Sequence, residues 1–309
     1  MTTHILTLFT RTPLHVGAGA SVGAIDQPVQ RERHTGFPVI PASSLKGSFA
    51  DQWNDGLVEE ETKDGTKKVR VNKKGAISEA AWLFGSDDAN AAFAGSLIFS
   101  EARVLAFPIR SAKGSYAWIT CPLMLQRAAR DGVISAIIPA EPKDDQAIFK
   151  TDGPLSLNNQ IVLEDYCFTH TGTYPEKLAA ALAALVPGDA LFQSITERLV
   201  ILSNGMMSHF ATTACEVAQH VRISDETGTA EGTGLFNQEN VPADTLFYSV
   251  LSATKSRVPN GEHHGKSAND ALAEFSQKVA AGKVFQFGGD ASTGLGFCSA
   301  TTNIKTQGA

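Results

Sequence analysis

The N-terminal stretch constrains the fold most, because it sets a strand, an irregular segment and a helix in a fixed order. Apolar and polar residues alternate from His4 to Thr12, which predicts a strand. Glycines and prolines then recur up to Ala42, too often for a helix or strand to persist. Leu45, Phe49 and Trp53 follow at a spacing of four residues and predict a helix with one apolar face.

The middle of the chain predicts further strands and helices. Leu97 to Ile109 is expected to form one long strand and Tyr116 to Thr120 another. Pro122 to Arg130 predicts a helix, because proline suits the first helical position. Pro175 to Leu202 predicts two helical stretches that are broken at Pro187.

The C-terminal part repeats the order of strand, helix and strand. Leu246 to Ser252 predicts a strand, and the apolar spacing from Ala271 to Gly282 predicts a helix. Val284 to Phe287 and Phe297 to Thr301 predict the strands that follow. Two such units, one near each end, predict an α+β sheet of the ferredoxin-like or RNA-recognition-motif (RRM-like) type.

Composition is that of a globular protein, with 43% hydrophobic and 19% charged residues among 309. The longest apolar run, Leu178 to Val186, is far shorter than the roughly 20 residues of a membrane-spanning helix. No membrane contact and no secretion signal are therefore expected, and the cytoplasm is the expected location. The four cysteines are widely separated, which predicts buried free thiols instead of a zinc site or disulfides.

The net charge of −6 counts against binding nucleic acid by bulk electrostatics, so any phosphate contacts must come from local clusters. Arg31, Arg33 and Lys46 lie close together in sequence. A second basic stretch falls in the polar segment Asp55 to Gly75, which is predicted to be a mobile inserted loop. Its basic residues are Lys63, Lys67, Lys68, Arg70, Lys73 and Lys74. They could bind RNA or only solvate the loop, and the sequence leaves both interpretations open.

Two segments could bind an anion. Ser43-Ser44-Leu45-Lys46-Gly47 stands at a predicted helix start, where free N–H groups and a lysine converge, although an ordinary serine cap explains the same residues. The loop from Gly288 to Gly296 lacks side chains that would keep a phosphate backbone away, although a flexible hairpin turn is the alternative. In this loop, Gly288, Gly289, Thr293 and Gly294 are the candidate contacts.

Two other motifs give weaker evidence of a functional site. Gly17-Ala18-Gly19-Ala20-Ser21-Val22-Gly23 follows a predicted strand, but it runs into Ile25-Asp26-Gln27-Pro28 instead of opening a helix, which counts against a dinucleotide loop. His263 and His264 stand in a glycine-flanked loop, where adjacent side chains rarely converge on one metal ion.

The segments gain specificity when they are taken together. Thr12 to Gly17, Asp26 to Glu32 and Ile40 to Gly47 jointly resemble the signature of the RAMP superfamily of CRISPR proteins. Within it, the chain looks like the backbone subunit of the type III-B, or Cmr, complex. Further blocks agree, namely Phe99 to Arg103, Ala117 to Pro122, Arg198 to Ser203, Asp244 to Tyr248 and the terminal Gly288 to Gly296 loop. Ala42 departs from the pattern, which has glycine there.

The resemblance implies one RAMP domain over residues 1–309, with a ferredoxin-like palm, inserted loops and a β-hairpin thumb within His209 to Asn240. It also implies the partners: a crRNA guide, target RNA, copies of the chain in a helical filament and other Cmr subunits. The expected guide contacts are Arg31, Ser43, Ser44, Lys46, Gly288, Gly289, Thr293 and Gly294. The chain has no RNP-type aromatic signature, so contacts to the RNA backbone should dominate.

For cleavage, the resemblance identifies Asp26 as the required residue and His15 as a helper. A solvated aspartate has a pKa near about 3.9 and is a poor base at neutral pH, so Asp26 suits a divalent metal better, with Mg²⁺ expected. The expected reaction is attack of a ribose 2′-hydroxyl on the adjacent phosphate. Sequence alone favours the alternative that Asp26 is a turn residue before Gln27 and Pro28. A non-catalytic RNA-binding protomer, or a backbone subunit of another CRISPR type with a DNA target, remain alternatives.

Overall fold

A central antiparallel sheet organises the computed structural model, which describes residues 3–19, 23–63, 65–72, 74–86 and 92–304. Strand β1 (Thr3–Thr10) lies between β16 (Leu246–Ala253) and β18 (Phe297–Ile304), and β16 also pairs with β8 (Ala102–Ser111). All of these pairings are antiparallel. A strand of the C-terminal unit thus lies between two strands of the N-terminal unit, which is the ferredoxin-like arrangement. The predicted α+β class is confirmed.

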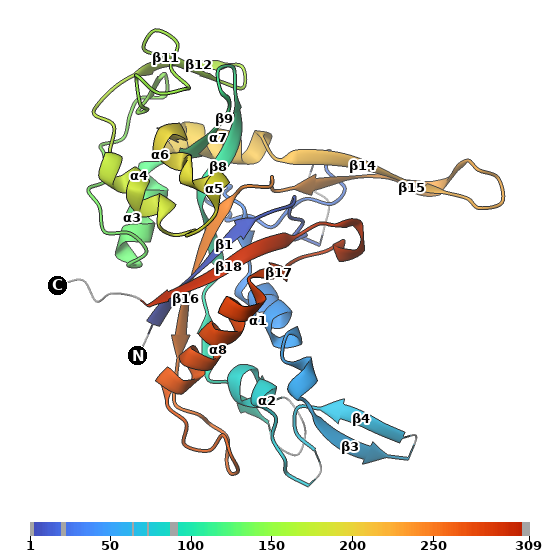
Figure 1. The fold of residues 1–309 in the computed structure, drawn as a ribbon. Helices are drawn as coiled ribbons and strands as arrows, with labels where there is room; N and C mark the ends of the chain where they lie inside the picture. Colours follow the sequence, from blue (N-terminus) through green and yellow to red (C-terminus); the bar gives the residue numbers. More distant parts are fainter. Residues whose placement is uncertain (1–2, 20–22, 64, 73, 87–91, 305–309) are drawn as a thin grey trace.

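Each face of this sheet carries its own helices and its own core (Figure 1). On one face α1 (Ala42–Asp51) and α8 (Ala268–Gly282) bring Phe49 and Phe275 to a ring distance of 4.9 Å. On the other face α3 (Pro122–Arg130), α4 (Glu176–Ala183), α5 (Ala190–Gln193) and α6 (Ile195–Arg198) form the cover. There Phe9 packs 4.8 Å from Phe192. Strand alternation explains the division, because successive residues of β1 point to opposite faces.

Shorter elements complete the fold. They are β2 (Val39–Ile40), α2 (Glu79–Phe84), β5 (Gly85–Ser86), β6 (Phe93–Ala94), β7 (Leu97–Phe99), β9 (Ser115–Thr120), β10 (Gln146–Ala147), β11 (Gln160–Leu163), β12 (Tyr166–His170), β13 (Leu199–Ile201), α7 (Asn204–Thr213) and β17 (Val284–Gln286), with single 3₁₀ turns at Asn54–Gly56 and Ala291–Thr293. Within the described ranges, no helix has the length and apolar character needed to cross a membrane.

The structure corrects several predictions about element boundaries and one about the cysteines. The strand expected from Leu97 to Ile109 is split at Ser100 and Glu101, where Val250 N donates to the Ser100 hydroxyl at 2.8 Å and Ser100 N donates to the Val250 carbonyl at 3.0 Å. The helical stretch expected up to Leu202 ends at Arg198, and β13 pairs in parallel with β9. The break near Pro187 is confirmed, and the Asp189 carboxylate caps α5. Cys167 is exposed, against the expectation of buried thiols.

Two hairpins project from the palm (Figure 1). The first, β14 (Glu216–Ile223) with β15 (Ala230–Asn240), lies within the range of 209–240 predicted for the thumb, and we refer to it as the thumb; residues 209–213 belong to α7. The second hairpin, β3 (Val58–Thr62) with β4 (Gly65–Val69), forms within the segment predicted to be a loop.

The second hairpin balances the charges of the basic stretch. Glu59 and Glu60 of β3 lie opposite Lys68 and Lys67 of β4, and the Lys67 ammonium is 3.1 Å from the Glu60 carboxylate. The lysines therefore face an acidic strand that precedes them in sequence. Lys73, part of the same basic stretch, lies outside the described residues, as do residues 20–22 of the glycine motif.

Candidate functional site

Three segments that are far apart in sequence meet where the thumb leaves the palm. They are the loop from Leu14 to Arg31, the end of β15, and the glycine-rich loop between β17 and β18. Three consecutive β15 residues, Asn237, Gln238 and Glu239, each hold a different part of these loops. The base of the thumb is therefore the support on which the predicted site residues are arranged.

Asn237 holds the segment that carries Asp26. The Asn237 side-chain oxygen accepts a hydrogen bond from Asp26 N at 2.7 Å, and Asn237 N donates to Asp26 Oδ2 at 2.9 Å. The Asn237 amide also donates to the carbonyl of Ala24 at 3.0 Å. Asp26 is exposed, and within the described residues no donor contacts its second carboxylate oxygen, Oδ1. One oxygen is thus fixed by the protein and the other remains available.

Glu239 fixes the other end of the same loop. Its carboxylate accepts from Val29 N at 3.0 Å and from the Arg31 guanidinium at 2.5 Å. Arg31 also donates to the carbonyls of Gly36 and Ala211 at 2.7 and 2.6 Å. The guanidinium, predicted to contact the guide, is therefore engaged inside the protein.

His15 lies in the interior beneath this loop. Only 7% of the residue is exposed, and its Nδ1 donates to the Glu239 carbonyl at 2.7 Å, because a carbonyl can only accept. The other ring nitrogen, Nε2, lies toward Gly17. The structure does not bring the His15 ring to the surface beside Asp26.

The glycine-rich loop packs directly against the His15 backbone. Gly289 N donates to the His15 carbonyl at 2.9 Å, and a Cβ at Gly288 would lie 2.1 Å from that oxygen. Gly288 also has a φ of 76°, which a side chain would strain. Gln238 ties the loop to the thumb through a 2.7 Å bond to Asp290. Gly288, Gly289 and Thr293 are exposed, and Gly294 is half-buried.

The start of α1 does not have the serine cap that was the alternative interpretation of this segment. Pro41 occupies the N-cap position without a side-chain capping bond, so Ser43 and Ser44 belong to the first turn. Proline fits this position because it has no N–H to leave unpaired. Ser43 is exposed, and Lys46 is half-buried one turn further on. The first N–H groups of α1 remain available for an anion.

A cleft of about 450 Å³ adjoins this helix start, and its walls carry charges of both signs. Arg31 and Arg103 line it together with Glu32 and Glu101. The lining thus includes two basic and two acidic residues. The cleft is therefore not a strongly cationic site, and anion binding here would depend on the helix N–H groups and on Lys46.

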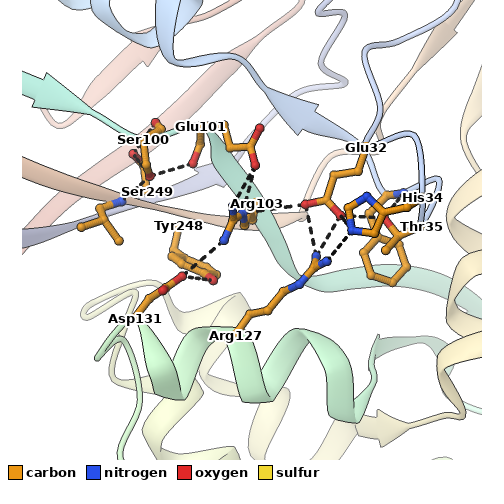
Figure 2. A network of polar contacts seen from close by, with 12 residues as sticks. Glu32, His34, Thr35, Ser100, Glu101, Arg103, Arg127, Asp131, Tyr248 and Ser249 are labelled. Atoms are coloured by element: carbon orange, nitrogen blue, oxygen red, sulfur yellow. Dashed lines mark hydrogen bonds and ion pairs between the residues drawn. The ribbon is translucent and has the colours of Figure 1, made fainter.

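A polar network beneath the cleft fixes the loop that follows Arg31 (Figure 2). The Glu32 carboxylate accepts from Arg127 at 2.8 Å and from Thr35 at 2.7 Å. Burial raises the pKa of Glu32, but the hydrogen bonds from Thr35 and Arg127 outweigh it and hold the pKa below its ordinary value. Arg103 extends the network to Asp131 at 3.5 Å, and the Tyr248 hydroxyl donates to the same carboxylate at 2.9 Å.

Comparison with known proteins decides the family. The model of the RAMP superfamily matches residues 7–299. The chain belongs to the RAMP superfamily. It is 32% identical to "CRISPR system Cmr endoribonuclease Cmr4" of Pyrococcus furiosus, over 99% of this chain and 98% of that protein. The RAMP chain also shares 35% identity with "CRISPR system Cms endoribonuclease Csm3" of Streptococcus thermophilus, over 29% of its length and 39% of the relative.

Solved structures agree with this assignment. A crystal structure of oligomeric Cmr4 from Pyrococcus furiosus matches 99% of the RAMP chain and 100% of that chain, with a TM-score of 0.67 and 25% identity. A chain of the type III-B Cmr-beta complex bound to cognate target RNA also gives a TM-score of 0.67, over 98% of this chain and 97% of that one. At 18% identity, the second likeness shows the fold alone.

The supporting residues of the site were missed from sequence. Asn237, Gln238 and Glu239 are ordinary polar residues in a strand, and the Asp26–Asn237 bonds join residues 211 positions apart. Glu239 stands among residues without any charge pattern that would single it out. The nearest signal in sequence was the uninterrupted polar run from Asn237 to Asn240 at the expected end of the thumb.

Proposed function

We propose that this chain is a repeating backbone subunit of a type III-B CRISPR ribonucleoprotein that binds the crRNA guide and cuts the paired target RNA. Family membership and the name of the Pyrococcus relative, an endoribonuclease, support this proposal. The observation that carries it is the Asp26 carboxylate, which is exposed, anchored at the thumb base through one oxygen, and available through the other.

The proposed guide contacts are made largely by backbone and small groups. They are the first turn of α1 with Ser43, Ser44 and Lys46, and the loop with Gly288, Gly289, Thr293 and Gly294. Such contacts would suit an acidic chain that must accept any guide sequence, because N–H groups bind phosphate without reading bases. Arg31 is excluded from this set, since Glu239 and two carbonyls engage its guanidinium.

The proposed reaction is attack of a target ribose 2′-oxygen on the adjacent phosphorus. The P–O2′ bond forms and the P–O5′ bond breaks, so the products carry a 2′,3′-cyclic phosphate and a 5′-hydroxyl. A carboxylate and a phosphate are both anions and repel each other, so Asp26 would act at the reacting phosphate only by holding a cation through Oδ1. Because the His15 ring is buried, water would take the 2′-hydroxyl proton and protonate the departing 5′-oxygen, while His15 would support the loop.

A divalent ion, with Mg²⁺ proposed, would fit this donor set only in the presence of RNA. Mg²⁺ commonly takes one or two carboxylates and fills its remaining positions with water and substrate phosphate. Asp26 would hold it through Oδ1. When bound, the ion would neutralise charge that develops on the phosphate.

The partners proposed are the crRNA guide, target RNA, further copies of the chain in a helical filament, and other Cmr subunits. The relatives' printed descriptions, "oligomeric Cmr4" and a Cmr complex bound to target RNA, support this set. The thumb would interrupt the guide–target duplex, for which its projection from the palm is suited (Figure 1).

A non-catalytic RNA-binding protomer is the second candidate. It is favoured by one observation: the described residues contain no group of three His, Cys, Asp or Glu side chains able to hold a metal. Among the described residues, Asp26 therefore belongs to no such group.

Two measurements test the proposal. Binding of single-stranded RNA should be independent of sequence and should weaken steeply with salt, because the contacts are to phosphates. The assembled complex with Mg²⁺ should convert target RNA into fragments that end in a 2′,3′-cyclic phosphate, and a chelator should stop this. Intact target RNA under all conditions would favour the non-catalytic protomer, and salt-independent binding would contradict the phosphate contacts.

A further inference from the structure

We propose that Asn237 is a positioning residue for the cut, which holds the Asp26 carboxylate in the orientation that target RNA requires. This inference rests on the proposed function. Asn237 lies on β15, on the thumb, whereas Asp26 lies in the loop after β1. Nothing in the chemistry of an asparagine suggests a direct role in breaking a phosphate ester, so it would act through Asp26.

The contact between the two residues is reciprocal. Asp26 N donates to the Asn237 side chain, and Asn237 N donates to the Asp26 side chain, at 2.7 and 2.9 Å. Two bonds in opposite directions fix both the position of the Asp26 backbone and the rotation of its carboxylate. The third bond, from the Asn237 amide to the Ala24 carbonyl at 3.0 Å, holds the preceding turn as well.

The neighbouring backbone contacts do not replace these bonds. Gln27 N donates to the Asn237 carbonyl at 3.1 Å, and Glu239 N donates to the Gln27 carbonyl at 2.9 Å. Neither contact depends on the Asn237 side chain. Truncation of that side chain should therefore leave the loop attached at Gln27, while Ala24 to Asp26 loses two of its anchors.

Among the described residues, the part of the loop from Gly23 to Asp26 has few other contacts. Gly23 has a φ of 61° and nothing within 4 Å of its Cβ position, and Ala24 and Asp26 are both exposed. Without the Asn237 side chain, the Asp26 carboxylate keeps its bond from Asn237 N, but the backbone of Ala24 and Asp26 loses two anchors, so the carboxylate could sample more orientations. A misplacement of about 1 Å at a reacting group commonly costs about 100-fold in rate. The contact thus bears on the rate of the cut more than on stability.

The test uses the assembled complex with Asn237→Ala, and Asn204→Ala as a matched control. Asn204 accepts from Leu123 N at 2.9 Å and donates to the Glu141 carboxylate at 2.6 Å, so its truncation likewise removes one accepted and one donated side-chain bond, but outside the site. Single-turnover cleavage, target affinity and hydrogen exchange of the Asp26 amide are measured in each. Asn237→Ala should cut about 10- to 100-fold more slowly with unchanged target Kd, and should lose protection at Asp26. Asn204→Ala should match the wild type in all three.

The outcomes separate the positioning role from the proposed function. Wild-type cleavage by Asn237→Ala, or equal slowing by Asn204→Ala, would overturn the positioning role. If the wild-type complex leaves target RNA intact, the proposed function fails and the catalytic purpose of Asn237 fails with it. Hydrogen exchange is independent of cleavage, and unchanged protection of the Asp26 amide in Asn237→Ala would show that Asn237 does not hold the loop.

Discussion

Replacement of Arg31 by alanine should destabilise the protein without removing a contact to RNA. Arg31 is paired with Glu239, and the two side chains are only 18% and 8% exposed. Loss of one partner of a buried pair commonly costs about 3 to 5 kcal/mol, and the partial exposure of Arg31 favours the lower end, about 3 kcal/mol. The unfolding entropy of a chain of 309 residues is about 0.65 kcal/mol/K, from about 2.1 cal/mol/K per residue. The expected fall in Tm is therefore about 5 °C.

Arg33→Ala is the matched control, because Arg33 is exposed in the same loop. Its Tm should change by less than about 1 °C, as is usual for surface substitutions. A second variant tests the mechanism: Glu239→Gln added to Arg31→Ala removes the uncompensated carboxylate and should recover part of the lost stability. Thermal unfolding by circular dichroism and RNA titration provide the readouts. Equal Tm for Arg31→Ala and Arg33→Ala, with RNA affinity lost only in Arg31→Ala, would refute this reasoning.

Three further predictions follow from the same contacts. Gly288→Ala should destabilise the chain by more than about 2 kcal/mol in thermal unfolding, because its Cβ would lie 2.1 Å from a carbonyl oxygen. Gly294→Ala, at a position with a φ of 91° and open space around the Cβ, should cost only about 1 kcal/mol, and equal costs for the two variants would contradict the packing. Lys46→Ala should weaken guide RNA binding and reduce the slope of log affinity against log salt concentration by about 1. Lys67→Ala should leave both nearly unchanged, because Lys67 is paired with Glu60 in its own hairpin. A larger loss for Lys67→Ala would mean that the phosphate site is elsewhere. The pKa of Glu32 is lower in the folded protein than its ordinary value of 4.5, so its contribution to stability should be present above pH 4.5 and lost as the pH falls through the folded pKa. Glu32→Gln should therefore lower Tm at neutral pH but not in acid. A difference in Tm that does not change with pH would contradict this.

The sequence predicted the palm well because its elements are defined locally. Alternation in the strand at His4 and the apolar spacing in the helix at Phe275 depend on neighbours within a few residues, and both elements are present in the structure. The same reasoning failed at Ser43, where a serine cap was expected and Pro41 takes that position instead. Sequence alone cannot distinguish a serine at the cap from one in the first turn.

The arrangement of the site could not be predicted, because it depends on contacts between distant segments. Asp26 and the glycine-rich loop were identified by resemblance, but the strand residue Asn237 that holds Asp26 was not. Likewise, Arg31 is as basic as any phosphate contact, and only the position of Glu239 across the loop identifies it as a structural residue. The acidic strand opposite Lys67 was missed for the same reason.

The most direct test of the proposed cleavage compares single-turnover cutting of target RNA by complexes that contain wild-type chain or Asp26→Ala. Asp26 is exposed, and its side chain accepts one hydrogen bond, so the substitution should cost no more than about 1 kcal/mol of stability. Assembly, guide binding and target Kd should therefore be unchanged, while cleavage in Mg²⁺ should fall to the level seen with chelator. Cutting at the wild-type rate by Asp26→Ala would contradict the assignment of Asp26 to the reaction.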